Sequence, residues 1–275
     1  METYLRANAA TSLTVVTTMA HTNRLIGLAT AVLETFLDLM APRLCPSCDA
    51  ALGEREDGYC DGCRASLEPA PFPRELYGEL SDALGRDELA LAVVGALYTF
   101  TQDGPVQRLV HAVKYLGCYD LGVALGRDLG RATTMFVEFG EIDCAVPVPL
   151  HPARRRERGY NQAEAIARGV AVARGIELMP QAILRRAHTR SQTRLGAGAR
   201  VANVAGAFAA GDADVAGRTV LVCDDVCTTG ATLNACAEIL LSRGARAVCA
   251  ATVARDLLVA TARREPPPPE LLGLA

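Results

Sequence analysis

The sequence predicts an α/β protein built around a parallel sheet, and two observations support this prediction. Segments with the apolar pattern of strands alternate along the chain with segments that read as helices. Half of the 275 residues are hydrophobic, which is enough for a sizeable core. Because Trp is absent and Tyr and Phe are sparse, that core is expected to consist mostly of Ala, Val and Leu.

The alternating elements can be assigned in chain order. The stretch 89–100 is strand-like, with Gly95 inside it, and 144–148 is a strand that runs into the turn "VPVP". The remaining strands are expected at 183–185, which is short, and at 219–223 and 247–254. Helices are expected at 106–115, 121–133, 161–174 and 232–243. Ligands of such sheets bind at the carboxyl ends of the strands, so functional residues are expected there.

Composition divides the chain into five parts. An N-terminal extension with an amphipathic helix is expected over 1–42, and Met19 is an alternative start to Met1. A four-cysteine module over 43–68 and a Pro-rich, acidic linker over 69–88 precede the main domain at 89–256, and a Pro-rich, disordered tail is expected over 257–275. No apolar run is long enough to span a bilayer and no secretory signal is recognisable, so a cytoplasmic location is expected.

Four cysteines have the spacing of a metal site. Cys45 and Cys48 form one C-x2-C pair, and Cys60 and Cys63 form a second after eleven intervening residues. Two such pairs supply four thiolates to a tetrahedral Zn²⁺, and the short polar stretch between them is too small to fold without a cross-link. Disulfides are the alternative, which the missing export signal disfavours. We therefore expect a structural zinc site that could also present a surface to a partner protein.

Positive charge is concentrated in one window of a chain whose net charge is −3. Residues 145–200 contain eleven Arg and three Glu. Such a patch suits an anionic ligand, although a solvated helix face is the plainer interpretation. Lys114 is the only lysine of the chain and lies where a helix is expected to end, so we place it near the site.

The stretch "VLVCDDVCTTGAT", residues 220–232, carries the strongest functional signal. A buried strand runs into Asp224 and Asp225, and a loop of small residues then leads into a helix. Free N–H groups of the first helical turn, the hydroxyls of Thr228, Thr229 and Thr232, and the absence of a side chain at Gly230 suit a phosphate. The two carboxylates would repel a bare phosphate, so they require sugar hydroxyls or Mg²⁺ on the same ligand. A ribose 5-phosphate meets both requirements. The alternative is that the acids and threonines only cap a turn and a helix.

This stretch resembles the phosphoribosyl pyrophosphate (PRPP) signature of type I phosphoribosyltransferases. Together with the four-cysteine module, it resembles the ComF family, which is associated with competence and DNA uptake in bacteria. "HAVKYLG" at 111–117, "VPVPLHPARRRERGYNQAEAIA" at 146–167 and "RRAHTRSQTRLGAGARVANVAGAF" at 185–208 also match. The resemblance covers roughly residues 42–255 and implies a type I phosphoribosyltransferase-like fold with a small zinc-ribbon module.

The resemblance also implies roles for individual residues. Asp224 and Asp225 would be the catalytic pair that holds the ribose hydroxyls. The 5-phosphate would bind at Cys227, Thr228, Thr229, Gly230, Ala231 and Thr232. The pyrophosphate would lie near Val148, Pro149, Leu150, His151, Arg154, Arg156, Arg158 and Lys114. A mobile hood would contribute Arg185, Gln192 and Arg200. Cys227 occupies a position that is often Ile or Val in the family.

Three functions remain open at this point. The first is a phosphoribosyltransferase that binds PRPP with Mg²⁺ and transfers the phosphoribosyl group to an acceptor that the sequence does not identify. The second is a non-catalytic sensor of PRPP or a similar phosphosugar, or an adaptor of the DNA-uptake machinery. The third is a protein that binds single-stranded DNA along the Arg-rich window, which lacks the aromatic residues typical of such sites except for Tyr160.

Overall fold

Five parallel strands form the central sheet of the protein, in the order β1-β7-β6-β2-β3. The computed structural model describes residues 42–85, 89–186 and 206–256. Its sheet consists of β1 (Val93–Phe100), β2 (Cys144–Pro147), β3 (Glu177–Leu178), β6 (Thr219–Cys227) and β7 (Ala247–Asp256). The predicted parallel-sheet α/β class is therefore confirmed, and β6 lies at the centre of the sheet.

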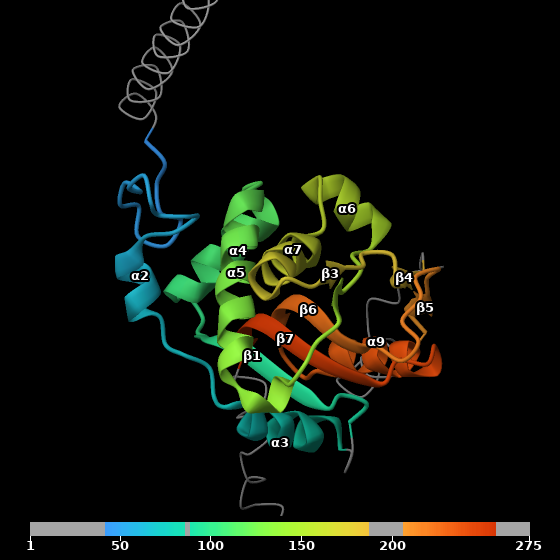
Figure 1. The fold of residues 1–275 in the computed structure, drawn as a ribbon. Helices are drawn as coiled ribbons and strands as arrows, with labels where there is room; N and C mark the ends of the chain where they lie inside the picture. The colour runs from blue at the N-terminus through green and yellow to red at the C-terminus, as the bar shows by residue number, and fades with distance from the viewer. Residues whose placement is uncertain (1–41, 86–88, 187–205, 257–275) are drawn as a thin grey trace, which may run out of the picture. The chain divides into compact units, whose positions relative to one another are not determined.

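Helices cover both faces of this sheet (Figure 1). One face packs against α4 (Pro105–Tyr115), α5 (Tyr119–Met135) and α7 (Gln162–Arg174), and the other carries α9 (Ala231–Ser242). Side chains of β6 alternate between the two cores: Leu221 and Cys223 belong to the first, and Val220 and Val222 belong to the second. β6 is thus buried on both sides, which explains its continuous apolar sequence.

Helices α5 and α7 approach each other closely because each has a glycine at the crossing. A Cβ atom added to Gly126 of α5 would lie 2.0 Å from the carbonyl oxygen of Ile166, and one added to Gly169 of α7 would lie 2.1 Å from that of Val123. Larger residues would push the helices apart. The close packing holds both helices together on one face of the sheet.

The segment 69–88, expected to be a linker, contains the helix α3 (Pro73–Leu84). Pro73 occupies the first helical position, Gly85 ends the helix in the left-handed conformation, and Leu76 and Leu80 are buried on the side that faces the domain. Leu76 and Leu80 lie one turn apart, which is the pattern of an amphipathic helix, but the acidic residues around them made the segment resemble a linker. Helix α3 packs on β1 and is part of the fold.

Other boundaries differ from the sequence predictions by a few residues. β6 continues to Cys227, so that Asp224 and Asp225 belong to the strand. Four arginines of the basic window lie on a short helix, α6 (Pro152–Arg158), which the sequence analysis did not predict. A small antiparallel pair, β4 (Ile183–Arg185) and β5 (Phe208–Ala210), flanks the main sheet. A 3-10 turn, η1 (Val137–Phe139), precedes β2.

The four-cysteine segment, which includes α2 (Asp61–Ser66), packs against the main domain. The Tyr59 ring is fully buried, and its hydroxyl donates to Asp128 Oδ2 of α5 at 2.7 Å and lies 2.9 Å from the Tyr98 hydroxyl of β1. Cys45 and Cys63 belong to the same apolar cluster as Tyr59. This segment therefore shares a core with the sheet.

Within the three described ranges, no helix combines the length and apolar character needed to cross a membrane. The expected N-terminal helix within 1–42 lies outside the described residues except for its last position. The C-terminal tail at 257–275 and the hood residues Gln192 and Arg200 also lie outside them.

Candidate functional site

Two adjacent carboxylates lie at the carboxyl end of the central strand. Asp225 is buried, and its Oδ1 atom lies 2.8 Å from Nζ of Lys114, at the end of α4. Its other oxygen, Oδ2, is buried and has no hydrogen-bond partner among the described residues. Asp224 is half-buried, and its Oδ1 accepts a 2.8 Å hydrogen bond from the backbone N–H of Asp225. The ion pair with Lys114 therefore satisfies half of one carboxylate, and a buried acceptor is left for a ligand.

The environment of the pair favours the neutral form of Asp224. Burial and the negative charge of Asp225 raise the Asp224 pKa above its ordinary value, whereas the Asp225 backbone hydrogen bond, Lys114 and Arg185 oppose that rise. A carboxyl group whose pKa is raised by burial and by a neighbouring negative charge is typical of a functional site. A cation or a hydrogen-bond donor on a ligand would lower the Asp224 pKa again.

Arg185 of β4 is half-buried, and its charge interacts with that of Asp224. Burial and the nearby charge of Arg154 lower the Arg185 pKa, and Asp224 raises it. The guanidinium lies 5.1 Å above the centre of the Phe208 ring, and its Nε is buried without a hydrogen-bond partner among the described residues. The structure therefore brings Arg185, Arg154 and Asp224 into one electrostatic neighbourhood.

The turn after β6 has the geometry of an anion-binding loop. Cys227 is buried, Thr228 is exposed, and Gly230 has a φ of 78° and precedes the first residue of α9. The Thr229 hydroxyl accepts a 3.5 Å hydrogen bond from the N–H of Ala231. Ala231 and Thr232 form the half-buried first turn of α9, whose N–H groups have no acceptor within the helix.

The thiol of Cys227 does not face solvent. Burial raises the Cys227 pKa to about 12, which outweighs the nearby positive charge of Arg255. The thiolate form of Cys227 is therefore disfavoured.

The segment that follows β2 lies beside this turn because β2 pairs with β6. The N–H of Val148 donates to the carbonyl of Cys223 at 2.9 Å, and the side-chain amide of buried Asn161 donates to the carbonyl of Val148 at 3.0 Å. Pro149 and Leu150 are half-buried. Asn161 also caps α7, so one side chain links the expected pyrophosphate loop to the helix behind it.

Helix α6 presents the arginines that follow this loop. The Nδ1 atom of His151 accepts from the N–H of Ala153 at 3.2 Å and caps the helix. Arg154 and Arg156 are exposed. The guanidinium of Arg158 lies 5.0 Å from the centre of the ring of Tyr115, the residue that follows Lys114 in the sequence. Of the residues expected near the pyrophosphate, Arg154, Arg156 and Arg158 thus lie on one short helix, which His151 caps through one ring nitrogen.

A buried arginine that the sequence patterns did not predict lies behind the turn after β6. Arg255, at the end of β7, is 1% exposed and donates through NH1 to the carbonyls of Cys227, at 3.3 Å, and of Thr228. Its Nε pairs with Glu79 of α3 at 3.2 Å. A charged residue inside the otherwise apolar run "AVCAATVARD" was a signal that could have identified it.

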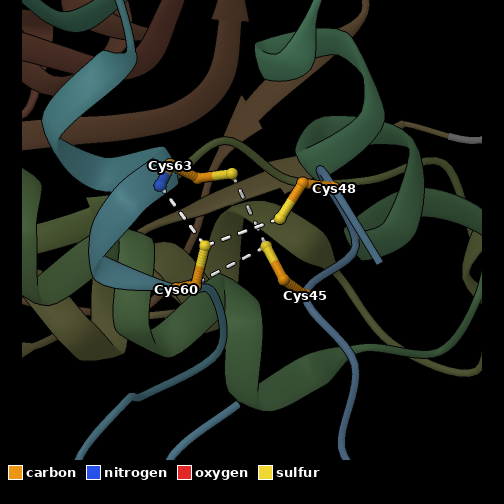
Figure 2. A group of neighbouring side chains, drawn as sticks. All are labelled: Cys45, Cys48, Cys60 and Cys63. Carbon is orange, nitrogen blue, oxygen red and sulfur yellow. Dashed lines mark hydrogen bonds between the residues drawn. The ribbon is translucent and has the colours of Figure 1, made fainter. Parts of the chain in front are cut away.

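The four cysteines converge on one point (Figure 2). Their Sγ atoms all lie within 4.8 Å of one another, with Cys45 and Cys63 at 3.8 Å and Cys48 and Cys60 at 3.6 Å. Sulfur atoms bound to tetrahedral Zn²⁺ are separated by about 3.8 Å, given Zn–S bonds of about 2.3 Å. The cluster is therefore compatible with structural zinc.

The surroundings of the cluster act differently on its cysteines. Burial raises the Cys45 pKa, but backbone hydrogen bonds from Cys60, Ser47 and Cys48 together lower it to about 7. Backbone N–H groups that point at sulfur are what a metal-bound thiolate requires from its environment. Burial raises the Cys63 pKa to about 12, so the case for a metal rests on the four-sulfur donor set and its geometry.

Comparison with known proteins agrees with this geometry. The sequence model of the phosphoribosyl transferase domain matches residues 157–267. The DNA utilization protein YhgH of Salmonella typhi is 33% identical over 147 residues, which cover 52% of this chain and 64% of that protein. Competence protein F of Haemophilus influenzae is 26% identical over 214 residues, which cover 73% of this chain and 91% of that protein.

Solved structures are more distant. Glutamine phosphoribosylpyrophosphate amidotransferase from B. subtilis is 19% identical, with a TM-score of 0.35 over 51% of this chain and 30% of that chain. The family match and the sequence relatives confirm the predicted resemblance: residues 157–267 match the phosphoribosyl transferase domain, a four-cysteine cluster precedes them, and relatives are named for competence and DNA utilization.

We predict that Asp224→Asn stabilises the ligand-free protein at alkaline pH. The folded protein holds the Asp224 proton more tightly than the unfolded chain does, so ionisation destabilises the fold as pH rises above about 4. Asn remains neutral, so the stability gain of the variant over the wild type should be at least about 1 kcal/mol larger at about pH 8.5 than at about pH 5. Urea unfolding at both pH values measures the difference.

Asp212→Asn is the control, because Asp212 is exposed. It should change the free energy of unfolding equally at both pH values. A stability gain for Asp224→Asn that does not grow with pH would contradict the raised pKa.

Proposed function

Because the chain carries a phosphoribosyl transferase domain, we propose that it binds PRPP together with Mg²⁺ and transfers the phosphoribosyl group to an acceptor. The observation that carries this proposal is the buried Oδ2 of Asp225, which has no hydrogen-bond partner among the described residues. Asp225 lies on the strand that leads into α9, whose first-turn N–H groups have no acceptor within the helix. A ligand with hydroxyls at one end and a phosphate at the other satisfies both features. Ribose 5-phosphate has this arrangement.

Each part of the ligand has a matching part of the site. Asp224 and Asp225 accept hydrogen bonds from the ribose hydroxyls, and Lys114 offsets the negative charge of the pair. The turn 227–232 binds the 5-phosphate through N–H groups and threonine hydroxyls. The segment 148–151 and the arginines of α6 face the diphosphate.

The reaction would be a displacement at C1 of the ribose. The acceptor's lone pair forms a bond to C1 while the bond from C1 to the diphosphate oxygen breaks, and the electron pair leaves with pyrophosphate. The acceptor loses its proton to solvent or a nearby base. Arg154, Arg156, Arg158 and Arg185 stabilise the charge that develops on the leaving group. Mg²⁺, bound through phosphate and carboxylate oxygens, would supply further charge neutralisation.

A second candidate function is binding of single-stranded nucleic acid. It is favoured by Tyr115, which is 57% exposed. The Tyr115 ring contacts Arg158 and the ring of His111, and the centroids of the two rings lie 4.8 Å apart. This ring supplies an aromatic surface next to the basic helix α6. Tyr115→Ala should then weaken binding of a labelled oligonucleotide severalfold at low salt, and an unchanged affinity would remove this candidate.

The proposed ligand can be tested by calorimetric titration of PRPP with Mg²⁺. The wild type should bind, and Asp224→Asn/Asp225→Asn should raise Kd by at least about 100-fold, because two charged acceptors for the ribose are lost. Asp120→Asn/Asp212→Asn removes the same charge from exposed positions and should bind like the wild type. Equal Kd values for all three proteins would refute the assignment of the carboxylates.

We also propose that the four-cysteine cluster holds one structural Zn²⁺. Cys48→Ser should lose the metal and lower the free energy of unfolding by at least about 2 kcal/mol, because Cys45 and Cys63 share a core with Tyr59. Metal analysis and thermal unfolding measure both effects. Cys118→Ser, outside the cluster, should keep its zinc. Full stability of the metal-free protein would contradict a structural role.

A further inference from the structure

A buried ion pair lies behind the proposed 5-phosphate turn. The Arg255 guanidinium, which stays charged in proteins, is 1% exposed at the end of a strand lined by small apolar residues. Desolvating such a charge costs several kcal/mol unless it is paired and hydrogen-bonded. Its partners therefore indicate what the residue does.

These partners connect two parts of the fold to the turn. NH1 donates to the carbonyl of Cys227 at 3.3 Å and also to that of Thr228. Nε lies 3.2 Å from Oε2 of Glu79, which belongs to α3. The guanidinium thus joins the turn to a helix that is about 150 residues away in the sequence.

The hydrogen bonds to the carbonyls determine which way the turn's N–H groups point. In a trans peptide the C=O and the following N–H point in opposite directions. When Arg255 holds the carbonyls of Cys227 and Thr228, the N–H groups of Thr228 and Thr229 point away from Arg255. Carbonyl oxygens, which repel an anion, are held on the side opposite to the one that the N–H groups face.

Helix α3 contacts the turn a second time through the next residue. A Cβ atom added to Gly230 would lie 2.9 Å from Cδ2 of Leu80, so Leu80 packs directly against this glycine. Two consecutive residues of α3, Glu79 and Leu80, therefore support the turn from the protein side.

We propose that Arg255 and Glu79 are positioning residues of the 5-phosphate turn. They fix its peptide groups in the orientation that binds the phosphate of a ribose phosphate, without touching the ligand. This inference rests on the proposed function, because it assigns the turn to the phosphate of that ligand.

The test is a calorimetric comparison of two ligands that cover different parts of the site. Ribose 5-phosphate reaches the turn, and pyrophosphate with Mg²⁺ reaches only the diphosphate region. Arg255→Lys keeps the positive charge but replaces the planar guanidinium, which reaches Glu79 through Nε and the carbonyls through NH1, with a single ammonium group. We expect its affinity for ribose 5-phosphate to fall at least about tenfold and its affinity for Mg²⁺–pyrophosphate to stay unchanged.

Two further variants make the comparison decisive. Glu79→Ala, whose side chain is 25% exposed in the wild type, should show the same split if Arg255→Lys fails to fold. Arg74→Gln, on the same helix and 85% exposed at its side chain, should bind both ligands like the wild type. Equal losses for both ligands, or no loss for ribose 5-phosphate, would overturn the positioning role.

Hydrogen exchange of the turn separates failure of this inference from failure of the proposed function. If the wild type binds neither ligand, the proposed function is wrong, and the amides of 228–230 then decide the role of Arg255. Faster exchange in Arg255→Lys than in the wild type and in Arg74→Gln would support an ordered turn that depends on Arg255. Equal exchange rates would overturn it.

Discussion

Two carboxylates side by side at the end of a buried strand must be compensated, and the structure around them can be understood from that requirement. Asp225 is paired with Lys114 through one oxygen, and its other oxygen has no hydrogen-bond partner among the described residues. Asp224 keeps a raised pKa because burial and its neighbour's charge outweigh the nearby cations. A ligand with several hydroxyls can donate hydrogen bonds to these carboxyl oxygens. The adjacent turn is a proposed anion site within reach of the same ligand.

The sheet order explains why these groups meet. β2 and β6 are parallel neighbours, so the segment after Pro147 and the carboxylates after Cys223 emerge at the same edge. Helix α3 and the four-cysteine segment strengthen this arrangement from outside the sheet. Tyr59 connects the cysteines to α5 and β1, and Glu79 connects α3 to Arg255. The N-terminal third of the described chain therefore supports the site.

Local patterns in the sequence were enough to predict some features and not others. The parallel sheet followed from alternating strands and helices, and the cysteine cluster followed from spacing, because both depend on neighbours in the chain. Helix α3 was missed because its polar residues hid Leu76 and Leu80. The pairing of Lys114 with Asp225, and of Arg255 with Glu79, joins residues more than 100 positions apart. Such partners are determined by tertiary packing, which the sequence alone does not reveal.

The central claim, that one ligand spans the carboxylates and the turn, is tested most directly by a crystal structure of the protein with PRPP and Mg²⁺. We predict that the ribose hydroxyls lie on Asp224 and Asp225, and that the 5-phosphate accepts hydrogen bonds from the N–H groups of 228–232. A ribose phosphate bound elsewhere, for example on the arginines of α6 with the turn unchanged and empty, would contradict the account.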